Sequence, residues 1–264
     1  MTIDVLVSTL NDGLYNLKIS DNKLKYKIIH QITNEKKDEY NKYYYEVLSK
    51  GSFVKYYPVF EKGLSKSRNY AISKSESDII WFMDDDVKIL ENAYENIISV
   101  FNDLDCDCVV FNHTSDKKLL RSFFIEQKKT AKILNLYNST GVSSIDICLR
   151  RSSLSKDADL KFDESFGLGS NNPSGEEYIF ISDLIKAGKK VFKSSLVTSY
   201  HKLEASGLDF FSSREKLYAK RNMLVRIFGL FKGNAFFIAF LIKKIPYIIK
   251  NKHVKTFITS LILR

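Results

Sequence analysis

The stretch "IIWFMDDDVKIL", residues 79–90, decides the fold, because a run of apolar side chains ends there in three consecutive carboxylates. The apolar run is typical of a buried strand. Asp84, Asp85 and Asp86 repel one another, so they need a cation or a solvated turn to remain ionised. The stretch alone leaves two interpretations open. One is a divalent metal site, and the other is an acidic turn before a helix over 91–101, whose positive end favours carboxylates.

The surrounding chain alternates segments typical of strands with segments typical of helices. Short runs rich in β-branched and aromatic residues predict strands over 3–9, 25–31, 53–59, 78–83, 106–112 and 143–149. Helices are predicted over 64–75, 91–101 and 175–188. This alternation predicts an α/β fold with a mostly parallel central sheet flanked by helices. Ligands of such sheets gather beyond the carboxyl ends of strands, where the three aspartates lie.

Length and composition are those of a globular protein with a sizeable core. The 264 residues, 44% of them hydrophobic, suit one large domain or a domain with an appendage. The start, "MTIDVLVSTL", lacks a basic segment followed by a long apolar stretch, so we expect no secretory signal and a cytoplasmic protein. Cys106, Cys108 and Cys148 lack the spacing of a zinc knuckle and are expected to be reduced core residues.

The excess positive charge lies at the C-terminus. Residues 216–264 contain 11 Lys and Arg and no Asp or Glu, in a chain whose net charge is +10. Lys243 and Lys244 interrupt the longest apolar cluster there, so no run reaches the ~20 apolar residues needed to cross a bilayer. Two interpretations remain, interfacial helices on an anionic membrane surface or a pair of helices packed on the preceding domain. Nucleic acid is disfavoured because the aromatic residues lie in apolar clusters.

Four segments together resemble the family 2 glycosyltransferases, which have the glycosyltransferase A fold. They are "VLVST" (5–9), "KGLSKSRNYAI" (62–72), "DIIWFMDDDV" (78–87) and "FDESFGLGSNNPSGEEYIFISDLIKAGKKVFKSSLVTSYH" (162–201). The last has a Gly-rich loop, an acidic pair opening a helix, a strand and a closing histidine. The resemblance covers about 3–201 and implies a Rossmann-like, nucleotide-binding catalytic domain, which we place over 1–208. The C-terminal region lies outside the resemblance, and its charge and apolar clusters predict a basic amphipathic helical region over 209–264.

The resemblance also implies a metal site made by the aspartates. Transfer from a nucleotide diphosphate requires neutralising the charge that builds on the leaving diphosphate, which a metal ion does. Asp86 is expected to be the first metal ligand, with Asp84 assisting directly or through water and the ribose, and His201 as a further ligand. Without the family, His201 would be interpreted as a surface or capping histidine. Oxygen ligands with one imidazole suit Mn²⁺ or Mg²⁺.

The catalytic base is expected at the start of the helix over 175–188. The resemblance assigns it to Glu177, with Glu176 as the orienting partner or reserve. A carboxylate in a partly desolvated pocket can take the proton of an acceptor hydroxyl. One base without a second nucleophilic carboxylate favours inversion at the sugar carbon. The alternative is ordinary acidic charge at a helix N-terminus.

Seven residues are expected to contact the donor: Ser8, Thr9, Gln31, Arg68, Asn69, Asp84 and Asp85. On an extended backbone, Asp85 would point away from its two neighbours. Arg68 suits either a phosphate contact or a structural salt bridge. Family members usually place an acidic residue just beyond the second strand, whereas this chain reads "IIHQITNEK". Gln31 or Thr33 could substitute by hydrogen bonding, so the nucleobase stays open.

These expectations predict an inverting, metal-dependent glycosyltransferase. It would move a sugar from a nucleotide-diphosphate donor to a hydroxyl of a glycan or lipid-linked acceptor, in bacterial surface polysaccharide synthesis, as a peripheral protein on the inner face of the cell membrane. The alternatives are a non-catalytic, membrane-docked assembly partner of the same fold and a nucleotidyltransferase, which would release pyrophosphate. The presence of Asp84, Asp86, Glu177 and His201 together disfavours a scaffold.

Overall fold

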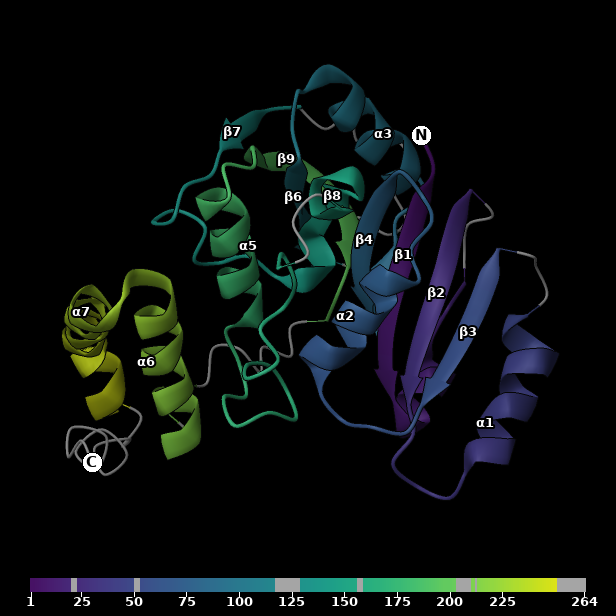
Figure 1. Cartoon of the computed structure of the whole chain (residues 1–264), viewed down its shortest axis with the longest axis horizontal. Helices are drawn as coiled ribbons and strands as arrows, with labels where there is room; N and C mark the ends of the chain where they lie inside the picture. Colours follow the sequence, from purple (N-terminus) through teal and green to yellow (C-terminus); the bar gives the residue numbers. More distant parts are fainter. Residues whose placement is uncertain are drawn as a thin grey trace.

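The computed structural model describes residues 1–19, 23–49, 53–116, 129–155, 159–202, 210–211 and 213–250. Within them, a nine-stranded sheet runs through the molecule in the order β3-β2-β1-β4-β8-β6-β9-β5, and β7 pairs with β9 (Figure 1). The strands are β1 (Ile3–Leu10), β2 (Leu24–Gln31), β3 (Val54–Val59), β4 (Ile79–Asp84), β5 (Lys88–Ile89), β6 (Cys108–Thr114), β7 (Ala131–Ile133), β8 (Ile147–Arg150) and β9 (Val191–Tyr200).

The sheet is parallel where the predicted site lies. β3, β2, β1 and β4 pair in parallel, so their carboxyl ends meet at one edge. β8 lies antiparallel between β4 and β6, and β6 returns to a parallel pairing with β9. This confirms the predicted α/β class with a central sheet flanked by helices. The structure adds antiparallel pairings: β8 joins the two parallel parts, and the short strands β5 and β7 each pair antiparallel with β9.

The helices lie on both faces of the sheet and, at the C-terminal end of the chain, beside it. They are α1 (Lys37–Tyr43), which continues as the π-helix η2 (Tyr44–Leu48), α2 (Leu64–Ser73), α3 (Ala93–Asp103), α4 (Ser152–Ser155), α5 (Glu176–Lys186), α6 (Arg214–Phe228) and α7 (Leu230–Lys250). Two short 3-10 helices, η1 (Asn11–Asn16) and η3 (Ser144–Asp146), follow β1 and precede β8.

Alternation along β4 shows why its sequence forms a central strand. Trp81 and Met83 lie in a core with residues of α1 and α3, whereas Ile80 and Phe82 lie in a second core with residues of α2 and α5. Side chains of a strand point alternately to the two faces of the sheet, so an uninterrupted apolar run is expected where both faces are covered. Because both faces of β4 are buried, its polar side chain lies at the carboxyl end, where the candidate site is found.

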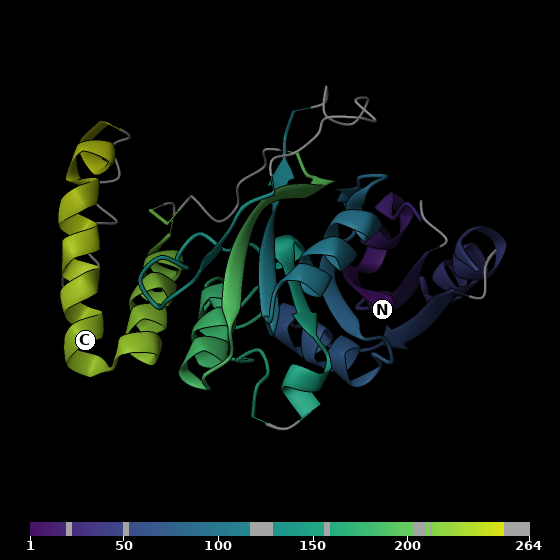
Figure 2. The same cartoon turned by 90° about the horizontal axis from the view of Figure 1, so that it is seen from above.

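The C-terminal helices form a third core beside this sheet. α6 and α7 lie side by side at one end of the molecule, far from α1 at the other end (Figures 1 and 2). Phe166 and Tyr178 of the preceding chain share that core with Met223 and Phe237. The helices are thus packed on the preceding domain, as one of the two interpretations of this region expected. The predicted boundary between 208 and 209 lies outside the described residues.

Two segments of the structure differ from the local pattern of the sequence. The segment predicted as a strand over 143–149 begins as η3 and becomes extended only at Ile147. The helix over 37–48 was not predicted, because its tyrosines give no apolar period; Tyr40 is buried in the core and Tyr44 stacks on Tyr56. The three cysteines are free and buried, as expected. Among the described residues, no helix has the length and hydropathy of a bilayer-spanning segment.

Candidate active site

The three aspartates at the end of β4 have three different environments. Asp84 closes the strand and accepts a hydrogen bond from Arg68, 3.3 Å away. Asp85 turns back toward β1, where the Thr9 hydroxyl donates to it. Asp86 is more than half exposed and lies 3.2 Å from Nε2 of His201. The three aspartates therefore contact three different parts of the chain, namely α2, β1 and the residue that follows β9.

Asp85 is held by β1 and by the turn after it. Burial raises its pKa, an effect that the hydrogen bond from Thr9 opposes. Gly13 of η1 lies so close that a Cβ there would be 2.2 Å from Oδ2 of Asp85 and 2.8 Å from Oγ1 of Thr9. Only glycine leaves room for this carboxylate. Gly13 was missed by the sequence analysis, since a glycine after a strand reads as an ordinary turn residue.

Arg68 is a buried cation among carboxylates. Its guanidinium on α2 is 2% exposed, and it donates to Glu176 at 3.0 Å and to the hydroxyl of Ser144 at 2.7 Å. Together with its bond to Asp84, these contacts join the end of β4, η3 and the start of α5. A buried charge requires such partners because desolvation is otherwise too costly. Arg68 thus fixes the position of the acidic pair relative to the strand end.

Glu177 lies next to this cluster without a direct hydrogen bond to it. Its Oε1 is 3.7 Å from Arg68, and the side chain is 22% exposed. Burial, followed by the neighbouring charge of Glu176, raises the pKa of Glu177 to about 8, while Arg68 acts in the opposite direction. Such a carboxyl can accept a proton near neutral pH.

The start of α5 is determined by a glycine and by α6. Gly175 caps the helix in the left-handed region at φ 101°, which glycine adopts without strain. Met223 of α6 fills the space beside it, since a Cβ on Gly175 would lie 2.8 Å from the sulfur. The two glutamates therefore occupy a first helical turn whose backbone is held from outside by the C-terminal helices.

Asp86 and His201 are the candidate metal ligands. His201 follows β9, which places its ring beside the carboxylate at the end of β4. No group of three or more His, Cys, Asp or Glu converges as a complete metal site within the described ranges. One carboxylate and one imidazole nevertheless fit Mg²⁺ or Mn²⁺, which commonly take their remaining ligands from substrate phosphates and water.

A second histidine adjoins this pair and was also missed. His113 at the end of β6 hydrogen-bonds to Asp146, 3.1 Å from Oδ1, and this contact raises the pKa of His113. Its ring meets that of His201 edge to face at a centroid distance of 6.1 Å. Asp146 is buried in η3, two residues after the Ser144 that binds Arg68. The sequence signal that could have found these residues is the pair of polar side chains, Ser144 and Asp146, on either side of Ile145.

The other predicted donor residues are already hydrogen-bonded within the protein, with Ser8 and Gln31 buried and Asn69 partly buried. Ser8 accepts a hydrogen bond from Ser67 of α2, and Gln31 donates to the carbonyl of Gly63. Asn69 donates to the carbonyl of Phe162 and to Glu164. These contacts favour a structural role for Asn69 and Gln31, which tie α2 to its neighbours.

In the described structure, no acidic residue lies directly after β2. The chain there is instead hydrogen-bonded to η1. Thr33 exchanges two hydrogen bonds with the side chain of Asn11, each 2.8 Å long. Asp12, next to Asn11, accepts from Tyr40 at 2.7 Å, a bond that lowers the pKa of this carboxyl. The turn after β1 therefore brings a carboxylate to the edge where the second strand lacks one.

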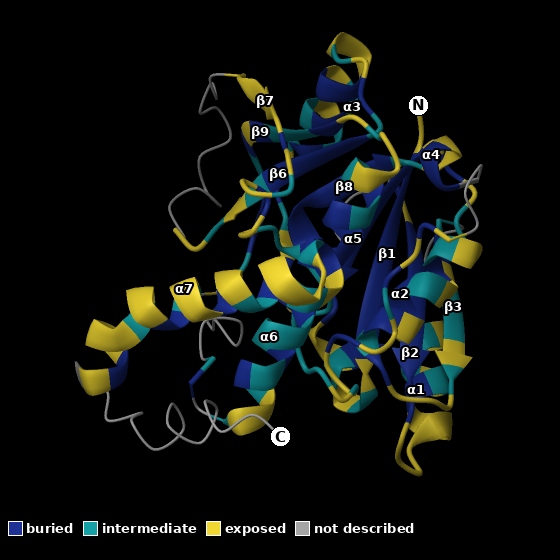
Figure 3. Ribbon diagram, turned by 60° about the vertical axis from the view of Figure 1, so that its left-hand side comes forward, coloured by how far each residue is buried: buried dark blue, intermediate teal, exposed yellow. Residues whose placement is uncertain are grey.

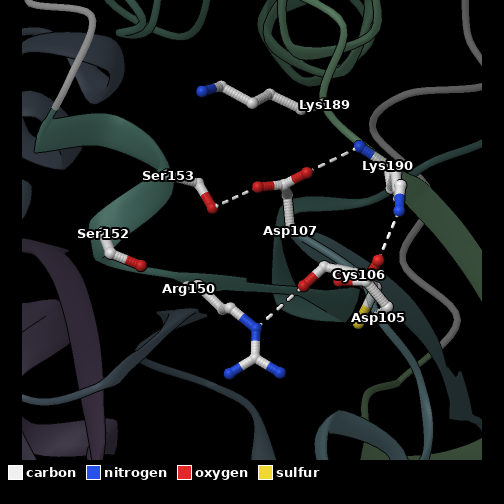
Figure 4. A pocket seen from close by; sticks show the side chains of 8 residues that line it. All are labelled: Asp105, Cys106, Asp107, Arg150, Ser152, Ser153, Lys189 and Lys190. Carbon is white, nitrogen blue, oxygen red and sulfur yellow. Dashed lines mark hydrogen bonds and ion pairs between the residues drawn. The ribbon is translucent and has the colours of Figure 1, made fainter.

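A polar pocket at the opposite end of the sheet is separate from this site (Figure 4). Its central carboxylate, Asp107, accepts from the hydroxyl of Ser153 and from the backbone N–H of Lys190, both at 2.7 Å. Arg150 donates to the carbonyl of Cys106. These groups satisfy one another and hold the starts of β6 and β9 together, so the pocket serves the fold.

Comparisons with known proteins agree with this architecture. The family model described as "Glycosyl transferase family 2" matches residues 19–156, just over half of the chain. Comparison with curated proteins gives no match. Among solved structures, Staphylococcus aureus TarS 1–349 in complex with UDP-GlcNAc superposes with a TM-score of 0.59 at 17% identity, over 86% of this chain and 66% of that one.

A mannosyltransferase also has this fold. The enzyme PcManGT from Pyrobaculum calidifontis, in complex with GDP-Man and Mn²⁺, gives a TM-score of 0.56 at 12% identity, over 86% of this chain and 62% of that one. The chain thus spans less than two thirds of the length of either protein. Both likenesses extend the shared fold well beyond residues 19–156.

Proposed function

Because the chain belongs to glycosyl transferase family 2, we propose that it is an inverting, metal-dependent glycosyltransferase that uses a nucleotide-diphosphate sugar. The observation that carries this proposal is the buried Arg68, which gathers Asp84 and the acidic pair of α5 around one cation. The arrangement supports the proposal because a carboxylate that could accept a proton lies beside the strand end where nucleotides bind in such sheets.

Glu177 is the proposed base. Its raised pKa suits it to take the proton of an acceptor hydroxyl while that oxygen attacks the anomeric carbon. As the new C–O bond forms, the bond from the sugar to the diphosphate breaks, and the diphosphate oxygen leaves with the electron pair. Glu176, fixed by Arg68, orients the start of α5. The family pattern implies one base and no second carboxylate acting as a nucleophile, which favours one displacement with inversion.

Asp86 and His201 are the residues that would hold Mn²⁺ or Mg²⁺. A bound divalent ion would act as a Lewis acid that neutralises the charge developing on the leaving diphosphate. Asp84, already paired with Arg68, would assist in holding the ion, directly or through water and the ribose. Asp85, Thr9 and Ser8 line the end of β1, where the donor nucleotide is expected.

The donor class is supported by the neighbours, whose complexes contain UDP-GlcNAc and GDP-Man. For this chain we propose a glycan or lipid-linked acceptor on the inner face of the cell membrane, in bacterial surface polysaccharide synthesis, a role that the likeness to TarS suggests. Residues 1–208 would form the catalytic domain, and 209–264 the basic helical region.

The direct test is a donor screen with the purified chain. We expect release of nucleoside diphosphate from one or a few nucleotide sugars, dependent on Mn²⁺ or Mg²⁺ and abolished by chelation. Release of pyrophosphate from a sugar phosphate and a nucleoside triphosphate would instead identify a nucleotidyltransferase. Absence of both reactions across the panel would contradict an enzymatic role.

A further inference from the structure

α7 has one apolar face inside the protein and another outside it. Phe237, Leu241 and Ile248 are buried against α6 in the third core. These residues are spaced by four and seven positions, as expected for one stripe of a helix. Phe236, Phe240 and Tyr247 make further ring contacts beside this inner face.

The outer face carries a second apolar stripe. Exposed large residues recur at helical spacing on it, and their exposed fractions reach 89% for Phe231, 62% for Ile242 and 64% for Ile249. Ile238 and Ile245 complete the stripe. Figure 3 shows exposed surface along most of α7. An apolar row of this length is unusual on a free surface and marks a place of interaction.

Positive charge borders this stripe. Lys232 and Lys243 are exposed and lie about a quarter turn or slightly more from it around the helix. No acidic residue occurs anywhere from 216 to 250. We propose that the outer face of α7 binds an anionic lipid surface, with the isoleucines entering the interface and the lysines meeting the headgroups.

A second copy of the chain fits this face less well than lipid. Two α7 helices packed through their outer stripes would bring lysines of both copies together, and neither helix has a carboxylate to pair with them. Like charges brought together across an interface oppose association. A bilayer provides both an apolar layer and negative charge, which matches the arrangement of isoleucine and lysine.

The lipid-bound helix α7 would be joined to the proposed catalytic helix α5 through α6, which packs against both. Lys186 of α5 donates to the carbonyl of Ile227 at 2.5 Å, and Arg226 of α6 pairs with Asp183 at 2.9 Å. Met223 packs at Gly175. The orientation of α5 toward a membrane acceptor rests on the proposed function, whereas lipid binding itself does not.

Vesicle sedimentation with the full chain tests the inference. We expect binding to phosphatidylglycerol vesicles, little binding to phosphatidylcholine vesicles, and weaker binding at high salt. Lys232→Gln and Lys243→Gln should each lower the partition coefficient about fivefold, which corresponds to about 1 kcal/mol. Ile242→Gln with Ile249→Gln should lower it at least about tenfold.

Matched controls are available far from α7. Ile133 on β7 is 61% exposed, almost the same as Ile242, and Lys42 on α1 is 73% exposed. Ile133→Gln and Lys42→Gln should leave vesicle binding unchanged. Equal partition to both vesicle types, no partition, or a dimer in sedimentation velocity that Ile242→Gln dissolves would overturn the lipid assignment. Donor cleavage measured without vesicles reports separately on the proposed function.

Discussion

The two halves of the candidate site differ in how completely the protein builds them. At the centre of the Arg68 half, the ion pair of Arg68 and Glu176 is almost fully buried, with 2% and 5% of the two side chains exposed, while Glu177 and Asp84 at its edge are 22% and 38% exposed. On the other side, 53% of Asp86 and 24% of His201 are exposed, and the two form a pair without a third ligand among the described residues. The half around the acidic pair is assembled by folding. The half around Asp86 must be completed by substrate, metal and water.

This difference predicts that changes in the two halves affect different quantities. A buried ion cluster contributes to both stability and activity, because removing one charge leaves the others unpaired. An exposed pair contributes little to stability. Variants should therefore separate the halves by comparing the free energy of unfolding with the rate of transfer.

The largest effect on transfer is expected in the exposed half. Asp86→Ala should reduce nucleoside diphosphate release to background, while the free energy of unfolding changes by no more than ~0.5 kcal/mol. The control is Asp105→Ala, which removes an exposed carboxylate paired with Lys190 at the opposite end of the sheet. If nucleoside diphosphate plus Mn²⁺ raised the Tm of Asp86→Ala as much as that of the wild type, the ligand assignment would be wrong.

Glu177→Gln should act on turnover with little effect on donor binding. The amide keeps the shape but cannot accept the proton, so kcat should fall by roughly 10² to 10⁴ while the donor KM barely changes. The same change at Glu176 should also disturb stability, because Glu176 carries the direct bond to Arg68. Turnover close to normal in Glu177→Gln would move the base elsewhere.

Arg68→Met should be the strongest test of the buried half. It leaves Asp84 and Glu176 without their common partner, so the free energy of unfolding should fall by about 3–5 kcal/mol in denaturant titration. Arg226→Met is the matched control, since Arg226 also pairs with two carboxylates but is 40% exposed. It should cost no more than ~1 kcal/mol. Equal losses would show that burial does not distinguish the two arginines.

Gly13→Ala probes Asp85, whose carboxylate is held by Thr9 and belongs to neither half. The added methyl group would overlap Oδ2 of Asp85, so we expect a loss of about 1–3 kcal/mol in stability and weaker donor binding. Gly141→Ala is the control, because a Cβ there meets no atom within 4 Å. Unchanged donor KM and Tm in Gly13→Ala would mean that Asp85 can move without consequence.

The smallest effect concerns pH. The charged form of Glu177 is the base, so with a pKa of about 8 the value of kcat/KM should rise about fivefold between pH 7 and pH 8. Folding raises this pKa from 4.5, so Glu177 contributes to the free energy of unfolding at low pH. This stabilising contribution is lost as the pH rises from about 4.5 toward about 8. Glu177→Gln should remove both dependences, and a profile identical in the variant would exclude Glu177 as their source.

The local pattern of apolar and polar residues was sufficient to predict many of the strands and helices. The apolar run before Asp84 predicted β4, and the acidic pair after Gly175 predicted α5 nearly to the residue. The prediction was incomplete where a segment has no clear period. The tyrosine-rich helix over 37–48 is held by packing of its rings, and η3 by hydrogen bonds of Ser144 and the carbonyl of Ile145.

The sequence by itself determined which residue types stand at the ends of the strands and that the C-terminal region is basic and amphipathic, because these follow from short-range order along the chain. Only the tertiary structure decided that Arg68 meets Glu176, 108 residues away, that Asp85 turns toward Thr9, and that His113 adjoins His201. The reason is physical: partners of a buried charge are chosen by strand order and helix packing, which bring together residues that no local period relates.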